Sequence, residues 1–325
     1  MTLISIVVRT YNEEQHIGRL LSGIMQQTVQ DIEVILVDSG STDATLSIAN
    51  RYPVKVVYLS PDEFSFGRSL NVGCQAARGK YLVFASAHVY PLYKDWLEQL
   101  IAPFTDPKVA LAYGKQSGGD CTKFSEHQVF AKWFPNESNL YQKHTFCNNA
   151  NAAIRRELWE QIPYDKELTG LEDLDWAKKA IAQGYHLAYV AEAEIVHLHN
   201  ETPTRIYNRY RREAIALKRI FPEEKFTLWD FASLFIGNVA SDSYHAVISK
   251  NILDNFRSIL VFRFMQFLGA YRGFSQKNPV TGILKRTFYY PNGKSNRSNV
   301  GIKVVNKRQI DYSMLLNERS QDGDN

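Results

Sequence analysis

The stretch Val34-Ile35-Leu36-Val37-Asp38-Ser39-Gly40-Ser41-Thr42-Asp43 decides the fold class of this chain. Its apolar first half is typical of a strand that is buried on both faces, as strands of parallel sheets are. The serine and glycine residues after Asp38 allow the backbone to turn tightly, and Thr42 or Asp43 can cap a following helix. Taken alone, the stretch could equally be a plain strand-to-helix connection, because short turn motifs occur in many proteins.

Strand-like and helix-like segments alternate on both sides of this stretch. The pattern predicts strands over residues 4–9, 34–37, 54–59, 81–85 and 109–113, with helices at 17–25, 45–51, 71–77 and 93–102. This alternation is typical of an α/β domain with a doubly wound, mostly parallel, Rossmann-like sheet. Ligands bind to such sheets at the carboxyl ends of the strands. Three polar segments lie there: Arg9-Thr10-Tyr11-Asn12, the turn after Asp38, and Ser86-Ala87-His88.

The size and composition of the chain limit its class. Its 325 residues, 45% of them hydrophobic, suffice for one large domain with an appended piece. A net charge of +4 without a concentrated basic face before the last third argues against a nucleic-acid partner. The three cysteines lack the spacing of metal ligands and fit a reducing compartment: Cys74, Cys121 and Cys147.

Neither a basic leader nor a long apolar run is visible in the sequence. The first residues look like a strand, and no uncharged apolar run reaches the roughly 18 residues that suggest a spanning helix. We therefore expect a cytoplasmic protein, either free or attached peripherally to the inner face of a membrane.

Several motifs occur in an order that is known from one family. They are Val7-Val8-Arg9-Thr10-Tyr11-Asn12-Glu13-Glu14, the Asp38 turn, Asn71-Val72-Gly73 with Ala76 to Tyr81, the segment from Asn148 to Arg156, and Glu172-Asp173. Over about residues 3–200 this series resembles family 2 glycosyltransferases of the GT-A fold, and within them bacterial enzymes similar to rhamnosyltransferases. The resemblance implies an inverting glycosyltransferase. It would move a sugar from a nucleotide-diphosphate sugar to a hydroxyl of a glycan or lipid-linked glycan.

The resemblance also implies roles for individual residues. Asp173 would be the general base that takes the proton of the acceptor hydroxyl, supported by Glu172. A carboxylate pair at this place could also simply cap a helix, because carboxylates interact favourably with the helix dipole, and both roles can hold at once. The nucleoside would be held by Thr10, Tyr11 and Asp38, and the acceptor side would include Asn149 and Asn151.

The sequence departs from the family pattern at three places. Arg9 stands where the family usually has proline, and Leu70 stands where an arginine usually precedes the Asn71 motif. Arg68 could compensate on the donor side, because arginine binds phosphate and base edges well. The largest departure is Ser86-Ala87-His88, which replaces the Asp-x-Asp pair that holds a metal ion in the family.

The missing acidic pair changes what the donor site can bind. Ser86 and His88 would contact the donor diphosphate, and His88 with His199 would be the candidate ligands of a divalent cation, Mn²⁺ or Mg²⁺. Imidazole suits softer ions than Mg²⁺, so Mn²⁺ is favoured. Alternation along an extended segment places His197 and His199 on one face. The alternatives are a buried histidine in a degenerate site for His88 and a surface pair for the other two.

An arginine-rich helix is expected after residue 203. Arg205 and Arg209, which lie nearest the histidines in sequence, could cradle the leaving diphosphate, although such arginines often lie on a solvated helix face.

We expect the boundaries to fall at a catalytic GT-A domain over 1–203, a helical extension over 204–285 and a polar tail over 286–325. The extension carries an apolar stripe at helical spacing with arginines between its members. Such a helix could lie in an anionic membrane surface, or its stripe could pack on the catalytic domain or on a second subunit of a homo-oligomer. The stripe consists of Ile252, Phe256, Ile259, Leu260, Phe264, Phe267 and Tyr271, and the arginines are Arg257, Arg263 and Arg272.

Two other functions compete with a glycosyltransferase. Loss of the Asp-x-Asp pair would suit a non-catalytic sugar-nucleotide-binding protein with a degenerate metal site, whereas retention of Glu172-Asp173 favours the enzyme. A nucleotidyltransferase on a similar sheet is a weaker alternative.

Overall fold

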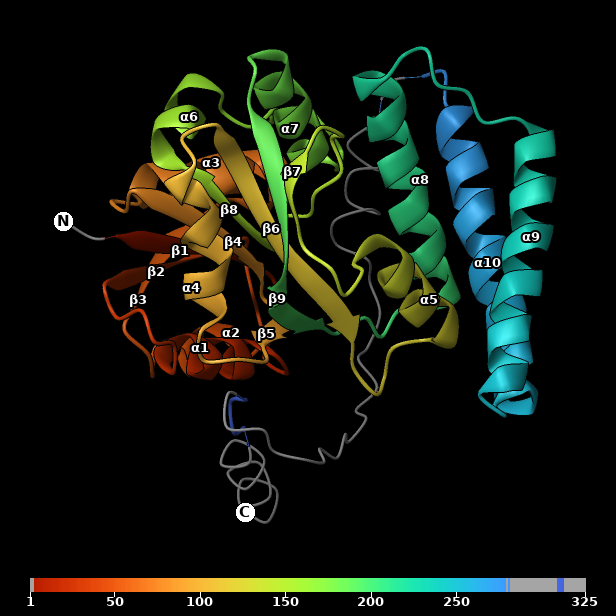
Figure 1. The fold of residues 1–325 in the computed structure, drawn as a ribbon, viewed down its shortest axis with the longest axis horizontal. Coiled ribbons are helices and arrows are strands. Elements are labelled where there is room, and N and C mark those ends of the chain that lie inside the picture. Colours follow the sequence, from red (N-terminus) through yellow and green to blue (C-terminus); the bar gives the residue numbers. More distant parts are fainter. Residues whose placement is uncertain (1–2, 279, 281–308, 313–325) are drawn as a thin grey trace.

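A computed structural model describes residues 3–278, 280 and 309–312 (Figure 1). The strands are β1 (Ile4–Thr10), β2 (Ile32–Asp38), β3 (Val54–Tyr58), β4 (Tyr81–Ser86), β5 (Val89–Pro91), β6 (Val109–Gly118), β7 (Asn139–Gln142), β8 (Asn151–Arg155) and β9 (His186–His197). The α-helices are α1 (Ile17–Met25), α2 (Thr45–Ala49), α3 (Phe66–Ala76), α4 (Trp96–Ile101), α5 (Phe124–Trp133), α6 (Arg156–Gln161), α7 (Glu172–Ala182), α8 (Pro203–Ile220), α9 (Leu228–Ile248) and α10 (Ile252–Phe274), with short 3₁₀ helices η1 (Pro61–Glu63) and η2 (Ala102–Thr105).

All described strands belong to one sheet. Its order is β3-β2-β1-β4-β8-β6-β9-β5, and β7 pairs with β9. Strands β1 to β4 are mutually parallel, as are β6 and β9, whereas β8 is antiparallel to both its neighbours. The expectation of an α/β, doubly wound, mostly parallel sheet is therefore confirmed.

The strand register brings the expected ligand-binding segments to one edge. Thr10 pairs with Asp38 across β1 and β2, and Arg9 pairs with Ser86 across β1 and β4. Because these strands are parallel, the turn after each of them leaves the sheet at the same edge.

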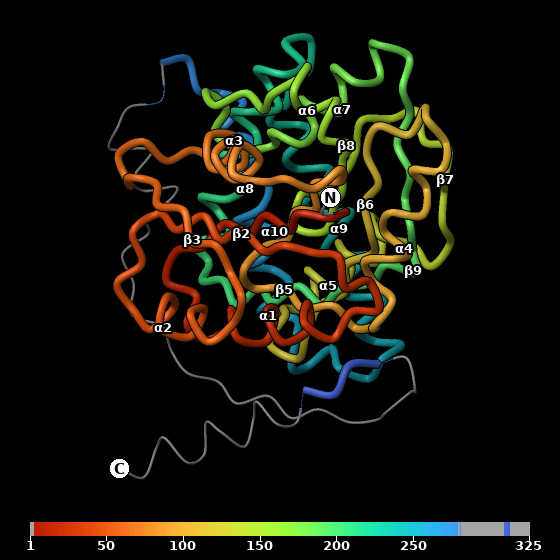
Figure 2. The backbone as a smooth tube through the Cα atoms, turned by 90° about the vertical axis from the view of Figure 1, so that its left-hand side faces the viewer, coloured from red at the N-terminus to blue at the C-terminus, as the bar shows by residue number. Residues whose placement is uncertain are grey.

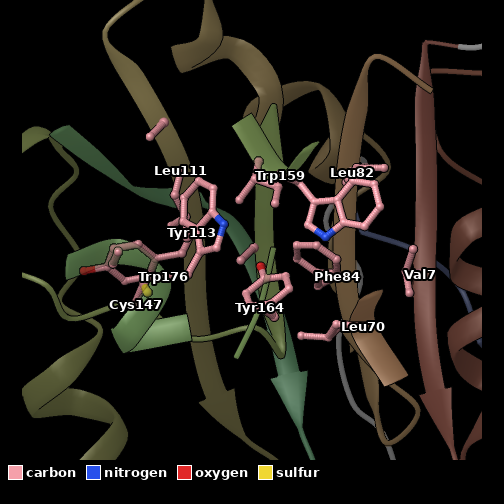
Figure 3. Close-up of a cluster of buried hydrophobic side chains, with 14 of the residues drawn as sticks. Val7, Leu70, Leu82, Phe84, Leu111, Tyr113, Cys147, Trp159, Tyr164 and Trp176 are labelled. Atoms are coloured by element: carbon pink, nitrogen blue, oxygen red, sulfur yellow. The ribbon is translucent and has the colours of Figure 1, made fainter. Parts of the chain in front are cut away.

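Helices cover both faces of the sheet. Helices α1, α2 and α4 lie on one side, and α3, α6 and α7 lie on the other (Figure 1). The second layer encloses a dense cluster of large side chains, in which Trp159, Trp176 and Tyr164 pack near Phe84 of β4 (Figure 3). Helix α3 approaches the sheet so closely that a Cβ added at Gly73 would lie 2.3 Å from Val7 Cγ1, so glycine is required there.

The C-terminal helices form a separate layer. Helix α10 lies between α8 and α9 (Figure 1). A Cβ added at Gly269 or Gly273 would lie 2.5 Å from the backbone oxygen of Tyr207 or Arg211, so α10 packs backbone against backbone on α8.

One expectation about this extension is wrong. Arg263 is not part of an exposed basic face, because its Nε and Nη2 atoms donate to the two carboxylate oxygens of Asp242 at 2.7 and 2.8 Å. Both side chains are buried, and Nη2 also donates to the backbone oxygen of Ser125. Arg263 therefore ties α10 to α9 and α5. None of the helices in the described ranges is long and apolar enough to cross a membrane.

A short part of the expected polar tail returns to the domain. Ile310 N–H donates to the Leu92 oxygen at 2.9 Å, and the Tyr312 hydroxyl donates to the Pro91 oxygen at 2.7 Å. Both side chains are buried, and Figure 2 shows this segment below α1. Residues 309–312 are thus not a free polar tail. The rest of the expected tail, 286–308 and 313–325, lies outside the described residues.

Candidate active site

The turn after β2 is held by its own aspartate. Asp38 is buried, and its Oδ2 accepts from the backbone N–H of Gly40 at 3.0 Å and of Ser41 at 3.1 Å. Gly40 has φ of +94°, a conformation that favours glycine. Beside it, the buried hydroxyl of Thr10 makes no hydrogen bond within the described structure. A ligand at this edge would therefore meet the Asp38 carboxylate, which already accepts hydrogen bonds from the turn, and the Thr10 hydroxyl, which has no partner in the described structure.

Asn12 joins the turns after β1 and β2, a role that sequence patterns did not reveal. Its Oδ1 accepts from Thr42 N–H at 2.8 Å, and its own N–H donates to Ser41 Oγ at 3.0 Å. Asn12 has φ of +54°, which asparagine tolerates better than most residues. Tyr11, which precedes it, is partly exposed at the same edge.

The acidic pair begins α7, as expected. Asp173 Oδ2 accepts from Asn149 N–H at 3.0 Å, and Oδ1 accepts from Leu174 N–H at 2.8 Å. Burial, together with the neighbouring Glu172 carboxylate, raises the pKa of Asp173 to about 7, against the opposing effect of the two amides and Arg9. Asp173 can therefore bind and release a proton near neutral pH.

Arg9 is a site residue whose role the sequence did not suggest. Its Nη1 donates to Glu172 Oε1 at 2.9 Å, across 163 positions of the chain. The guanidinium also lies 4.8 Å from the ring centre of Phe66. Arg9 thus brings a positive charge to the acidic pair, and only its departure from the usual proline could have drawn attention to it.

The two candidate acceptor-side asparagines differ. Asn149 is buried beside Asp173, and its Nδ2 has no hydrogen-bond partner in the described structure. Asn151 is completely buried: its Oδ1 accepts from Trp96 Nε1 at 2.8 Å, and its Nδ2 donates to two backbone oxygens. Because all its polar atoms are engaged inside the sheet, we do not include Asn151 in the proposed acceptor site.

Three histidines meet at the end of β9. The ring centres of His197 and His199 are 4.0 Å apart, and that of His88 lies 5.1 Å from His197. One ring nitrogen from each histidine lies within 4.8 Å of the others. The prediction that His197 and His199 share a face is confirmed, and His88 joins them. Nitrogen donors at this spacing fit a borderline divalent cation better than Mg²⁺.

The environment sets the charge of these histidines differently. Burial opposes a charged His88, but Glu13 and Glu201 outweigh it and raise the pKa of His88. Burial and the neighbouring positive groups lower the pKa of His197 well below its ordinary value. His197 is therefore a neutral imidazole at neutral pH.

Arg209 lies beside the histidines, as proximity in sequence suggested. Its Nη2 donates to Glu126 Oε1 at 2.6 Å and is 2.7 Å from Glu201 Oε2. Burial favours the neutral acid at Glu126, but Arg209 and His199 lower its pKa to about 2. Glu126, on the unexpected helix α5, was missed because its segment carries no recognised motif.

The two remaining arginines lie at helix starts. Arg205 is partly exposed in the first turn of α8. Arg68 lies in the first turn of α3, and its Nη2 donates to Glu63 Oε1 at 2.6 Å between half-exposed side chains. Arg68 is thus paired on the surface rather than with the acidic pair or the histidines. Ser86 ends β4, where its N–H donates to the Ala150 oxygen.

Comparison with known proteins shows which family this chain resembles. The model of glycosyl transferase family 2 matches residues 5–162. The O-antigen chain rhamnosyltransferase WbaN of Salmonella anatum is 32% identical over 222 residues, covering 65% of this chain and 70% of WbaN. RfbN of Salmonella typhimurium, another O-antigen chain rhamnosyltransferase, is 29% identical over 219 residues, covering 64% of this chain and 70% of RfbN.

The fold agrees with a solved structure. The mannosyltransferase PcManGT from Pyrobaculum calidifontis, in complex with GDP-Man and Mn²⁺, has a TM-score of 0.56 at 19% identity. The match covers 83% of this chain and 86% of PcManGT. From the sheet, the ordered motifs and the identity to WbaN, we conclude that the chain belongs to glycosyltransferase family 2.

Proposed function

We propose that this glycosyltransferase inverts the configuration of the sugar it transfers, from a nucleotide-diphosphate donor to a hydroxyl of a glycan or lipid-linked glycan. The observation that carries the proposal is Asp173, a buried carboxyl with a pKa raised to about 7 at the start of α7. A general base works best when its pKa lies near the operating pH.

The position of Asp173 supports a proton transfer from the acceptor. The Asp173 carboxylate accepts the proton of the acceptor hydroxyl while the hydroxyl oxygen attacks the anomeric carbon from the face opposite the diphosphate. Glu172, paired with Arg9, keeps its own charge compensated and is a positioning residue. The unpartnered Nδ2 of Asn149 can donate to an acceptor oxygen beside the base.

The donor would lie along the edge formed by β1, β2 and β4. Thr10, Tyr11 and Asp38 would hold the nucleoside, and Ser86 and His88 would face the diphosphate. PcManGT binds GDP-Man and Mn²⁺, which supports a donor of this class and a divalent cation here. The cation, held by His88 and His199, would offset the charge of the leaving diphosphate. Arg205 and Arg209 would cradle the leaving diphosphate, although Arg209 already pairs with Glu126 and Glu201. Arg68 has the least support.

The acceptor class is supported by the relatives. WbaN and RfbN are both named O-antigen chain rhamnosyltransferases, so polysaccharide biosynthesis is the process we propose for this chain.

The α9–α10 hairpin would contact a partner. The exposed apolar side chains of α9 are Leu228, Trp229, Leu234, Ile236, Tyr244, Val247 and Ile248. Residues 231–249 include no lysine or arginine, and Arg263 is buried, so an anionic membrane finds little complementary charge on α9. We therefore favour a second copy of the chain on this face. The cytoplasmic location expected from the sequence stays a prediction.

A donor screen followed by product analysis tests the proposed function. A panel of nucleotide sugars is screened for thermal stabilisation, because a ligand that binds only the folded state raises the melting temperature. The stabilising donor is then incubated with candidate glycan acceptors, and the anomeric configuration of the product is determined by NMR. We expect inversion. Retention would overturn the mechanism, and donor binding without transfer to any acceptor would favour a non-catalytic sugar-nucleotide-binding protein.

A further inference from the structure

The three histidines are positioned by backbone pairing rather than by chance contact. Val89, next to His88, pairs with His197 across β5 and β9, and Leu198 N–H donates to the His88 oxygen at 3.1 Å. His88 on the turn after β4 is thereby held opposite the alternating pair His197 and His199. The convergence of the rings is a property of the sheet, which is a rigid support for a site.

Each imidazole has the same nitrogen engaged. His88 Nδ1 lies 2.8 Å from Glu13 Oε1, and His199 Nδ1 lies 2.7 Å from Glu126 Oε1. His197 Nδ1 lies 2.8 Å from Gln116 Oε1. A donated Nδ1–H leaves the lone pair on Nε2, which is the tautomer a metal ligand needs.

This arrangement is the one that metal-binding histidines usually show, since their second nitrogen commonly donates to a carboxylate or carbonyl oxygen. The remaining nitrogen of His197 is a strong indication: Nε2 is buried and makes no hydrogen bond in the described part of the chain. A buried polar atom without a partner is unfavourable, and a bound ion would satisfy it.

A histidine stack with a purely structural role accounts for fewer of these contacts than a metal site does. Stacking alone requires neither three oxygen partners on three Nδ1 atoms nor an unpartnered Nε2. The neighbouring set Glu126, His199 and Glu201 is a weaker metal candidate, because Arg209 pairs with both of its carboxylates.

We infer that the Nε2 atoms of His88, His197 and His199 form a three-nitrogen centre that binds Co²⁺, Zn²⁺ or Mn²⁺ in preference to Mg²⁺. Glu13, Gln116 and Glu126 orient the ligands. Three imidazole nitrogen donors suit borderline ions, whereas Mg²⁺ requires oxygen ligands and gives up its water reluctantly. Any role of this centre in donor binding depends on the proposed function, whereas metal binding itself does not.

Direct titration tests the inference without any assay of transfer. The full chain is stripped with a chelator and titrated with Co²⁺ by calorimetry and visible absorption, and bound metal is counted by elemental analysis. We expect one Co²⁺ per chain, with absorption bands typical of nitrogen ligation, and no displacement by millimolar Mg²⁺. Absence of saturable binding, or equal binding of Mg²⁺ and Co²⁺, would overturn the inference.

Variants locate the site. We expect His197→Ala to weaken Co²⁺ binding at least 100-fold, and Gln116→Leu to weaken it about 10- to 100-fold while leaving all three ligands in place. His245→Ala, on the exposed face of α9, is the matched control and should bind normally. His88→Asn and His199→Asn repeat the test if His197→Ala does not fold. Unchanged affinity in the folded ligand variants would contradict the inference.

The outcomes also separate the metal centre from the proposed function. Co²⁺ binding without transfer to any acceptor leaves the centre in place and overturns the function, whereas transfer by a chain that binds no metal does the reverse.

Discussion

The acidic pair and the histidine cluster occupy the same edge of one sheet, yet burial acts on them in opposite directions. Burial raises the pKa of Asp173, because it disfavours the carboxylate, and lowers the pKa of His197, because it disfavours the imidazolium. The result in both places is a group that accepts a proton or an ion at neutral pH. Burial can therefore favour a proton acceptor in one region and a neutral ligand in the other.

The two regions also compensate charge in opposite ways. Arg9 pairs with Glu172 beside the proposed base Asp173, whereas Glu13 and Glu126 accept from the histidines. The comparison predicts that the acidic pair governs the chemical step and that the histidine cluster governs ion binding.

The largest effect is expected at the base. Asp173→Asn keeps the shape of the side chain but removes its basicity, so turnover should fall about 100-fold or more while donor affinity changes little. Steady-state kinetics and donor titration measure the two quantities. Asp175→Asn, in the same helical turn but paired with Lys179, is the control and should stay near wild-type turnover. Near-normal turnover in Asp173→Asn would exclude it as the base.

The next effect concerns the charge beside the base. In the wild type, kcat/KM should rise with pH through about 7, because Asp173 must lose its proton to act. Arg9→Met removes a positive charge that lowers the pKa of Asp173, so this rise should move to higher pH. An unshifted profile would show that Arg9 has no electrostatic role.

A smaller effect is expected on stability. The folded state holds the Asp173 proton more tightly than the unfolded chain, in which an aspartate keeps its ordinary pKa of about 3.9. This group therefore lowers stability progressively as pH rises from about 4 to above 7. Asp173→Asn should raise the melting temperature by about 3–6 °C at pH 8, and the gain should vanish near pH 4. A gain that is equal at both pH values would contradict this linkage.

The smallest effect on activity is expected outside both regions. Ile236→Asp with Val247→Asp on α9 should dissociate an oligomer in analytical ultracentrifugation while leaving turnover within about twofold. Arg257→Glu with Arg272→Glu, on α10, is the control. A monomeric wild type would overturn the second-copy proposal. If that monomer also binds anionic vesicles at low salt, the membrane alternative is correct.

Much of the fold and part of the site followed from local sequence. The apolar run before Asp38 and the alternation of strands and helices predicted the sheet type. Both are local patterns, because the burial and the periodicity of an element can be read from residues adjacent in sequence. Ordered motifs pointed to the family, and alternation placed His197 and His199 on one face. Asp173 was found because Glu172-Asp173 matches the acidic motif of the family.

Tertiary structure alone decided which distant residues meet. Arg9 forms a hydrogen bond with Glu172, which lies 163 positions away in the sequence. The hydrogen bonds of His88 with Glu13 and of His199 with Glu126 span 75 and 73 positions. The same applies to Arg263, which local spacing placed on a surface and which the fold buries against Asp242. The physical reason is that periodicity specifies a face of an element, whereas the partner of that face depends on strand order and helix packing. Strand order and helix packing form only when the whole chain folds and buries its apolar surface.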